Sequence, residues 1–193
     1  MGKIDVITIQ HPNEFKGGTR IMIRTNRSKE NGGKGEDVLE KVVTRSVDEF
    51  FDTFNAMSSR RSGQERIYST VDERDVKKAI RIFKERQLDA DYYDEESKES
   101  FYIDIHNRWI SALQNPSAAK TSLFMVDVDE GDDLEKIYQE ISHNSLEILH
   151  EYDTKNGKHI ILKPFNPKIV TFKIMQNGMM LLAYNAYKTT KLK

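Results

Sequence analysis

The strongest constraint on the fold lies in residues 123–162, where the hydrophobic pattern changes its period twice. Residues 123–129 form an apolar run that ends in acidic residues, and apolar residues then repeat at helical spacing over 134–141. Alternation over 146–150 and an apolar run over 159–162 indicate two more strands. Asn156-Gly157 joins these strands as a tight turn, because both residues tolerate positive φ. The order predicts a mixed α/β domain with helices packed on a largely antiparallel sheet.

The same periodicities predict further elements on both sides of this stretch. Strands are expected at 4–9, 20–24, 66–70, 170–175 and 179–184. The first two form an N-terminal hairpin in this interpretation, and the last two form a hairpin that turns at Asn177-Gly178. Helices are expected over 38–54, after a capping box at 70–73, and over 101–113, with another capping box at Ser46. The glycine-rich residues 31–35 and the acidic residues 89–99 are interpreted as solvated loops.

Length and composition limit the classes of protein to which the chain can belong. With 193 residues, 37% of them hydrophobic, we expect a single domain over 1–193, made of an N-terminal α/β part (1–120) and a site-bearing part (121–193). The absence of Cys excludes disulfides, thiolate zinc sites and Cys nucleophiles. No run approaches the roughly 20 apolar residues of a membrane span, and the N-terminus has no apolar signal core. We therefore expect a cytoplasmic protein with no membrane partner.

The net charge of −1 conceals an uneven distribution of charge along the chain. No Asp or Glu follows His159, whereas six Lys do, which leaves 24 basic and 31 acidic residues in the first 159 positions. A basic end on an acidic body favours a polyanionic partner such as nucleic acid. The alternative is that these lysines only keep the chain soluble.

Asp127 and Asp129 are the strongest candidates for chemistry. They lie two residues apart on an expected strand, so both side chains leave the same face, with Cα atoms about 6.6 Å apart. Two carboxylates at a strand end can hold Mg²⁺ or Mn²⁺ together with phosphate oxygens, and such a metal can neutralise charge that builds on a phosphate. The alternative is a solvated strand end at which Asp129 or Asp132 caps the next helix.

A second group of candidates could contact phosphate. His159 begins the strand after the Asn-Gly turn, where it could bind a nucleotide phosphate, ligate a metal or have a purely structural role. Basic side chains near His159, or at a predicted strand-to-helix junction, could also bind phosphates: Lys155, Lys158, Lys163, Arg60 and Arg66. Ordinary pairing with neighbouring acids is the alternative for the arginines.

Two segments together resemble the catalytic core of archaeo-eukaryotic primases and primase-polymerases: residues 124–129 (FMVDVD) and residues 156–161 (NGKHII). The resemblance implies an RRM-like core in which Asp127 and Asp129 bind catalytic divalent metals and His159 contacts the incoming nucleotide. The family also places a third metal-binding acid on a strand after the His. No acid follows His159 here, so the third ligand would have to come from elsewhere, for example Asp104, Glu151 or Asp153.

The sequence leaves two leading functions. The first is a primase-like nucleotidyltransferase or nucleotide-binding protein that uses Mg²⁺ or Mn²⁺ at Asp127 and Asp129, with a nucleoside triphosphate or nucleic acid as partner. The second is a non-catalytic nucleic-acid-binding or interaction protein on a related fold. An accessory protein with merely solvated acids is a third interpretation. A haloacid-dehalogenase-type phosphatase is disfavoured, because that family carries its Asp-x-Asp near the N-terminus. The short, cysteine-free chain suits a phage or mobile-element protein.

Overall fold

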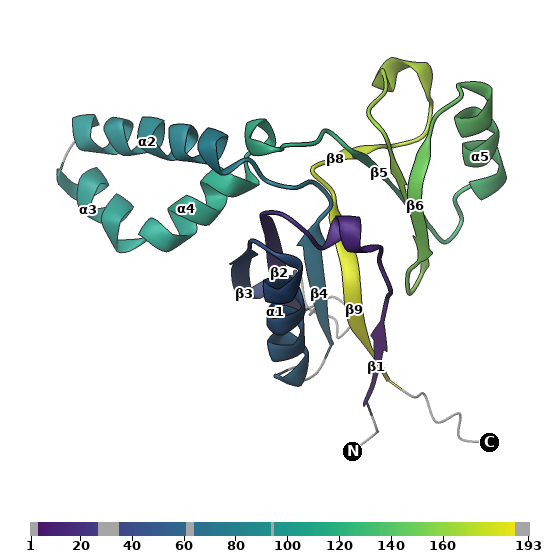
Figure 1. Cartoon of the computed structure of the whole chain (residues 1–193), viewed down its shortest axis with the longest axis horizontal. Helices are drawn as coiled ribbons and strands as arrows, with labels where there is room; N and C mark the ends of the chain where they lie inside the picture. The colour runs from purple at the N-terminus through teal and green to yellow at the C-terminus, as the bar shows by residue number, and fades with distance from the viewer. Residues whose placement is uncertain (1–3, 27–34, 61–63, 94, 188–193) are drawn as a thin grey trace. The chain divides into compact units, whose positions relative to one another are not determined.

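A computed structural model describes residues 4–26, 35–60, 64–93 and 95–187 (Figure 1). The chain divides into two compact units. Unit 1 holds Met1–Thr70 with Met179–Lys193, and unit 2 holds Val71–Gly178. This division differs from the expected boundary after residue 120, because the chain leaves the first unit at Thr70 and returns to it at Met179. Both units contain antiparallel sheets, so the expected mixed α/β class with antiparallel pairing is confirmed.

Unit 1 is built on a five-stranded antiparallel sheet with the strand order β1-β9-β4-β2-β3. Its strands, in that order, are Ile4–Thr8, Met179–Tyr187, Glu65–Thr70, Arg20–Asn26 and Asp37–Thr44. The expected N-terminal hairpin is wrong, because β1 pairs with β9 and not with β2. The run Met180–Ala183 in β9 is fully buried, so this strand takes the sheet interior and needs a partner on both edges.

One helix, α1 (Val47–Ser59), contacts β2, β3 and β4 and buries Phe50 and Met57. Its expected cap is confirmed, since the Ser46 hydroxyl accepts a hydrogen bond from the Glu49 backbone N–H at 3.2 Å. A helix beginning at residue 38 was expected, but α1 begins only at Val47. Residues 37–44 form β3 instead, where β-branched valines suit a strand that pairs with β2.

Unit 2 contains a four-stranded antiparallel sheet in the order β6-β7-β5-β8 and a helix, α5 (Leu134–His143). The strands, in that order, are Ile148–Asp153, Gly157–Leu162, Phe124–Asp129 and Met175–Gln176. The helix and three of these strands were expected and are confirmed. Helix α5 covers one face of the sheet, where a core forms from Phe124, Val126, Val128, Ile137, Ile141, Ile160 and Leu162.

Three further helices of unit 2 pack together around aromatic side chains: α2 (Val76–Tyr93), α3 (Glu95–Ile103) and α4 (Ile105–Gln114). The Phe83 ring lies 5.4 Å from Phe101 and 5.9 Å from Trp109. The expected acidic loop is wrong, because most of residues 89–99 are helical, with acids in the first turn of α3, where the helix dipole favours them. The second capping box is also wrong: Asp75, and not Thr70, accepts the backbone N–H groups of the first turn of α2.

The expected C-terminal hairpin is wrong, because the segments on either side of Asn177-Gly178 belong to different sheets. Strand β8 pairs with β5 in unit 2, whereas β9 pairs with β4 and β1 in unit 1. Asn177 does adopt positive φ, at 57°. The turn chemistry was therefore correct and the pairing was not. The expected loop at 31–35 lies mostly outside the described residues. Among the helices that the structure describes, none is long and apolar enough to cross a bilayer.

Candidate functional site

The candidate site lies at the open edge of β5 in the unit 2 sheet. Side chains alternate along β5, so Val126 and Val128 enter the core beneath α5 while Asp127 and Asp129 leave the other face. Strand β8 pairs only with Phe124 and Met125. Beyond that point a groove follows the open edge of β5, between α5 and residues 171–175, and both aspartates line it. The structure therefore confirms that the two acids share a face.

His159 lies directly opposite Asp127 in the register of β7 and β5. Its Nε2 atom is 2.9 Å from Asp127 Oδ1. The imidazole is almost fully buried, whereas the Asp127 side chain is 42% exposed. The structure thus brings together the two residues that the sequence placed on separate strands. The histidine is buried, and the carboxylate is open to solvent.

Tyr152, which the sequence interpretation missed, completes a hydrogen-bonded row across β6, β7 and β5. Its hydroxyl is 2.7 Å from His159 Nδ1, and its ring is as buried as the imidazole. An ionised carboxylate only accepts hydrogen bonds, so His159 must donate from Nε2 to Asp127. In the neutral imidazole Nδ1 is then the acceptor, and Tyr152 donates to it. The row fixes both the orientation and the tautomer of His159.

The register of the β6–β7 turn explains why Tyr152 was missed. The Thr154 N–H donates to the Gly157 carbonyl at 2.8 Å, so Lys155 and Asn156 occupy the turn. The expected turn had Asn156 and Gly157 at its centre. Gly157 instead begins β7, and a Cβ there would lie 1.8 Å from the Val128 carbonyl oxygen. The glycine is needed for close approach of two strands, not for positive φ.

Asp129 is the second acid available to a cation. Its carboxylate forms no hydrogen bond or ion pair with any residue in the described ranges. Neither Asp129 nor Asp132 caps α5, because the Asp133 carboxylate accepts the Lys136 backbone N–H at 3.0 Å. Asp132 instead accepts the Asp129 backbone N–H at 2.9 Å. The carboxylates of Asp127 and Asp129 thus remain side by side at the groove.

The third acid that the resemblance implies is not found with them among the described residues. No group of three or more His, Asp or Glu side chains within the described residues is arranged to hold a metal ion. Glu151 accepts the Tyr138 hydroxyl at 2.6 Å and Asp153 pairs with Lys158, both on the α5 side of the sheet. Asp104 precedes α4 and bonds to Asn107. Two carboxylates fit a Mg²⁺ or Mn²⁺ ion that takes its other ligands from water and phosphate, but not a cage made of protein ligands.

The lysines expected to bind phosphate are distributed around this sheet. Lys158 lies opposite Val128, on the α5 side, 3.2 Å from Asp153 and 3.5 Å from Glu151. Burial lowers the pKa of Lys158, but the Asp153 hydrogen bond and the nearby acidic groups outweigh it and raise that pKa above its usual value. The structure does not bring Lys158 to the Asp127 face.

The two other lysines lie at opposite ends of β7. Lys163 follows the strand and pairs with Glu147 at 2.8 Å, at the end of the sheet where β5 begins. Lys155 occupies the β6–β7 turn, at the end of the sheet where Asp129 faces Gly157. Of these two lysines, Lys155 is therefore the one at the end of the sheet that carries Asp129.

Arg60 and Arg66 belong to unit 1. Arg60 follows α1 and pairs with Glu40 at 2.9 Å. Arg66 lies in β4, where it is largely buried and its guanidinium donates to the Tyr68 hydroxyl at 3.4 Å. The alternative of pairing within the protein, left open by the sequence, describes Arg60 in this structure.

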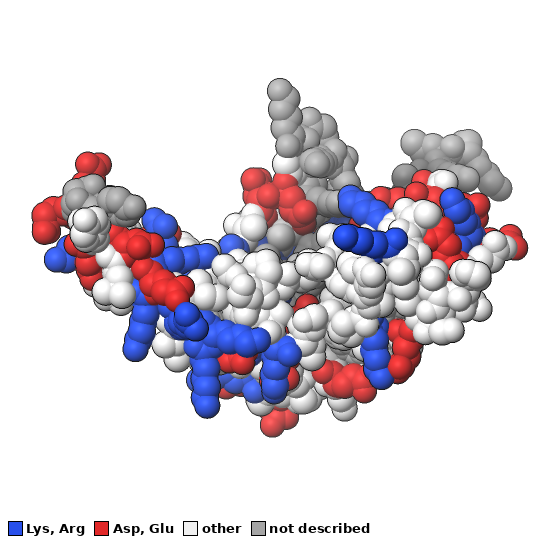
Figure 2. All heavy atoms as spheres, turned by 90° about the horizontal axis from the view of Figure 1, so that it is seen from above, with Lys and Arg blue, Asp and Glu red and all other residues white. Residues whose placement is uncertain are grey.

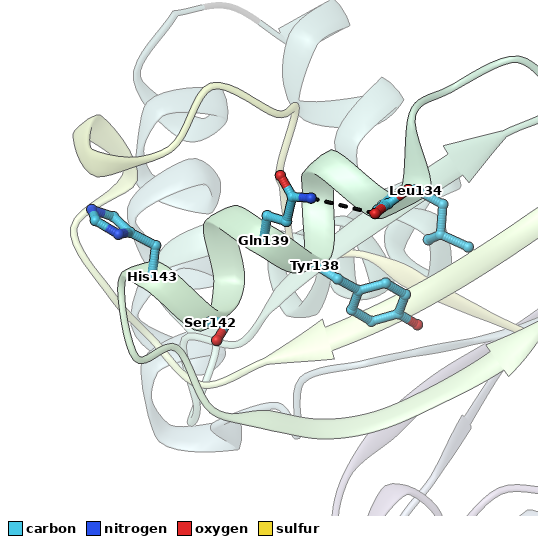
Figure 3. A pocket seen from close by; sticks show the side chains of 6 residues that line it. Leu134, Tyr138, Gln139, Ser142 and His143 are labelled. Atoms are coloured by element: carbon cyan, nitrogen blue, oxygen red, sulfur yellow. Dashed lines mark hydrogen bonds between the residues drawn. The ribbon is translucent and has the colours of Figure 1, made fainter.

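A second hollow lies on the outer surface of α5. It is lined by Leu134, Glu135, Tyr138, Gln139, Ser142 and His143. Figure 3 shows that Tyr138 and His143 point in different directions and that Gln139 reaches back to Glu135, 3.5 Å away. The polar groups do not converge on a common point, so we assign no chemistry to this hollow.

Comparison with family models, curated proteins and solved structures gives no match to this chain. Function is therefore inferred from its own residues. The site consists of a pair of exposed carboxylates, one of them held by a buried His–Tyr pair, beside an open groove. This arrangement can hold a hard cation and, through it, a phosphate group.

Proposed function

We propose that unit 2 binds a nucleoside triphosphate through one divalent cation held by Asp127 and Asp129, on a primase-like core of RRM type. The observation that carries the proposal is the placement of His159 against Asp127, with Asp129 on the same face. The resemblance to primases and primase-polymerases implies that the two acids bind divalent metals and that His159 contacts the nucleotide, so it supports a single site for these three residues. Nucleotidyl transfer to a nucleic acid is the reaction that the resemblance implies.

Each residue has a defined part in this proposal. Asp127 and Asp129 present carboxylate oxygens to Mg²⁺ or Mn²⁺, which neutralises phosphate charge when bound. The His159 Nε2–H holds Asp127 Oδ1 and so orients this carboxylate, whose side chain is 42% exposed at the groove. Tyr152 holds His159 through Nδ1. Because Nε2 is engaged with Asp127, His159 acts here as a positioning residue, and a direct phosphate contact would require that bond to be exchanged.

The second candidate is a protein on the same core that binds nucleic acid without catalysis. It is favoured by the acid count, since the described residues supply two carboxylates where two-metal phosphoryl transfer needs more ligands. The two candidates differ in the number of metal ions bound and in the need for a triphosphate.

The experiment is a Mn²⁺ titration followed by electron paramagnetic resonance, with and without ATP or GTP. We expect one bound Mn²⁺ per chain, bound more tightly with nucleotide, and loss of binding in Asp127→Asn/Asp129→Asn. Asp153→Asn is the matched control, because this acid lies on the opposite face of the same sheet. Equal Mn²⁺ binding by the double variant and the parent would refute the site.

Thermal unfolding under the same conditions gives an independent readout. A ligand at about 100 times its Kd stabilises the folded state by about 2.7 kcal/mol, and we expect this shift in the parent and in Asp153→Asn only. Primer extension with Mn²⁺ then separates the candidates: product indicates transfer, and nucleic-acid binding with no product and no bound Mn²⁺ or triphosphate indicates the non-catalytic protein.

A further inference from the structure

The N-terminal half of α2 carries a concentrated positive charge that the candidate site does not use. Residues 77–86 contain five basic residues and a single acid. Lys77, Arg81 and Lys84 follow one another at intervals of four and three positions, so they form one stripe along the helix. All three are exposed. We refer to these three residues as the basic stripe.

The opposite face of α2 is fixed by packing. Ala79 is fully buried, and the Phe83 ring contacts Phe101 of α3 and Trp109 of α4. Arg86, on this inner side, donates to the Ser111 hydroxyl at 3.0 Å. Because α3 and α4 pack on the other face, the basic stripe lies on the solvent-exposed side of α2, which also exposes the apolar side chains of Ile80 and Leu88.

Two of the three stripe residues have no counter-charge among the residues that the structure describes. The side chains of Lys77 and Lys84 form no ion pair or hydrogen bond with any residue that the structure describes. Arg81 pairs with Glu85 at 3.0 Å, but both side chains are more than half exposed, so solvent screens that pair. Figure 2 shows Lys and Arg gathered over the helical part of unit 2, with Asp and Glu toward its outer end.

The dimensions of the stripe fit a nucleic-acid strand. Seven residues of helix rise about 10 Å, which is the axial length of about three phosphates on one strand. Binding would release condensed counterions, which supplies most of the free energy of non-specific binding to nucleic acids. No array of side chains suited to reading base edges accompanies the stripe among the described residues, so the contact is one with the backbone.

The acidic residues where α2 ends and α3 begins argue against an anionic membrane as the partner. We refer to α2 and α3 together as the helical hairpin. Six of residues 89–99 are Asp or Glu, at the end of α2 and the start of α3. A flat anionic bilayer would meet both ends of the hairpin and would be repelled by the acidic one. A narrow strand can follow the stripe and avoid the acids.

We propose that the basic stripe of α2 binds the phosphate backbone of a nucleic-acid strand without reading its sequence. The proposal depends on α2 alone and holds whether or not Asp127 and Asp129 bind a metal. It also gives the helical part of unit 2 a function that the paired acids do not explain.

The test is fluorescence anisotropy with a labelled single-stranded oligonucleotide of mixed sequence, in EDTA, over a series of salt concentrations. We expect Lys77→Gln/Arg81→Gln/Lys84→Gln to bind at least about tenfold more weakly than the parent, with a log Kd against log salt slope reduced by about 2, or about 0.7 for each lost phosphate contact. EDTA removes any contribution from a cation at Asp127 and Asp129, so failure here is distinguishable from failure of the metal site.

The matched control removes the same charge elsewhere. Lys41→Gln/Lys98→Gln/Lys168→Gln lies outside α2 and should bind like the parent. Circular dichroism and the unfolding midpoint check that the stripe variant is folded, and Lys77→Arg/Lys84→Arg should retain binding. Equal affinity and slope in the stripe variant and the parent would overturn the proposal. So would a parent that binds vesicles of phosphatidylserine and phosphatidylcholine but not the oligonucleotide.

Discussion

Gly157→Ala provides the most direct test of how the candidate site is built. A Cβ at this position would lie 1.8 Å from the Val128 carbonyl oxygen and 2.9 Å from its carbonyl carbon. Real Cβ atoms essentially never approach closer than 3.0 Å, so the two strands must separate by more than 1 Å. The obstacle is backbone, which cannot rotate away as the end of a side chain could.

The cost follows from what the separation disrupts. Overpacking a well-packed region costs about 1–3 kcal/mol, and each ladder hydrogen bond lost between β5 and β7 adds about 1 kcal/mol. We therefore expect the free energy of unfolding to fall by about 2–5 kcal/mol, which lowers the unfolding midpoint by about 5–15 °C. The pair Asp127 and His159 lies two positions along the ladder, so their hydrogen bond should lengthen as well.

The assay combines thermal unfolding with hydrogen exchange of the β5 and β7 amides. Gly35→Ala is the control, because nothing lies within 4 Å of a Cβ there and its φ is not in the left-handed region. We expect that control to stay within about 0.5 kcal/mol of the parent. A Gly157→Ala protein with the midpoint of the parent and unchanged amide protection would refute the reasoning.

Three further predictions concern single side chains. Tyr152→Phe leaves the buried Nδ1 of His159 without its Tyr152 partner and should cost about 1–3 kcal/mol by chemical denaturation; a stability equal to that of the parent would contradict the hydrogen-bonded row. Asp72→Ala removes a buried acceptor of a hydroxyl and a backbone N–H, and we expect a loss of about 2–4 kcal/mol in the same assay. Hydrogen bonds from the Thr171 hydroxyl and backbone N–H lower the pKa of the Glu140 carboxyl. The hydrogen bonds between Thr171 and the Glu140 carboxylate should therefore be fully formed at neutral pH. They should be lost as the pH falls through that lowered pKa. The exchange rate of the Thr171 amide should show this pH dependence in the parent and not in Glu140→Gln.

Local patterns predicted the elements of the site well, because their signals are strong and close together in the chain. The strand that ends in Asp127 and Asp129, helix α5 and strands β6 and β7 were all expected from residues 123–162. Asp127 and His159 could be placed near each other because a tight turn and an antiparallel sheet leave few alternatives. Tyr152 was missed because its partner depends on the register of the turn, and a shift of one residue in the turn changes which residues face each other.

Long-range pairing could not be predicted in the same way. Strand β1 pairs with β9, at the opposite end of the sequence, and no local pattern encodes such a partner. The same limit explains the false hairpin at Asn177-Gly178, where a correct turn signal joins two different sheets. At 89–99 composition misled for another reason: Glu has good helix propensity, so an acidic run can be helical when neighbouring apolar residues pack.

The path of the chain through its two units has a consequence for synthesis. Strands β4 and β9 are hydrogen-bonded neighbours, with Thr70 opposite Met179, so unit 2 is an insertion between the two arms of what would otherwise be a hairpin. On the ribosome, all of unit 2 emerges before β9 does. Because β9 separates β1 from β4 in the sheet, β1 pairs with none of the other described strands and must wait for β9 to be made. A shortened variant in which a two-residue turn replaces residues 71–178 would bring the arms together at once, and its refolding rate would measure how long the insertion delays the sheet.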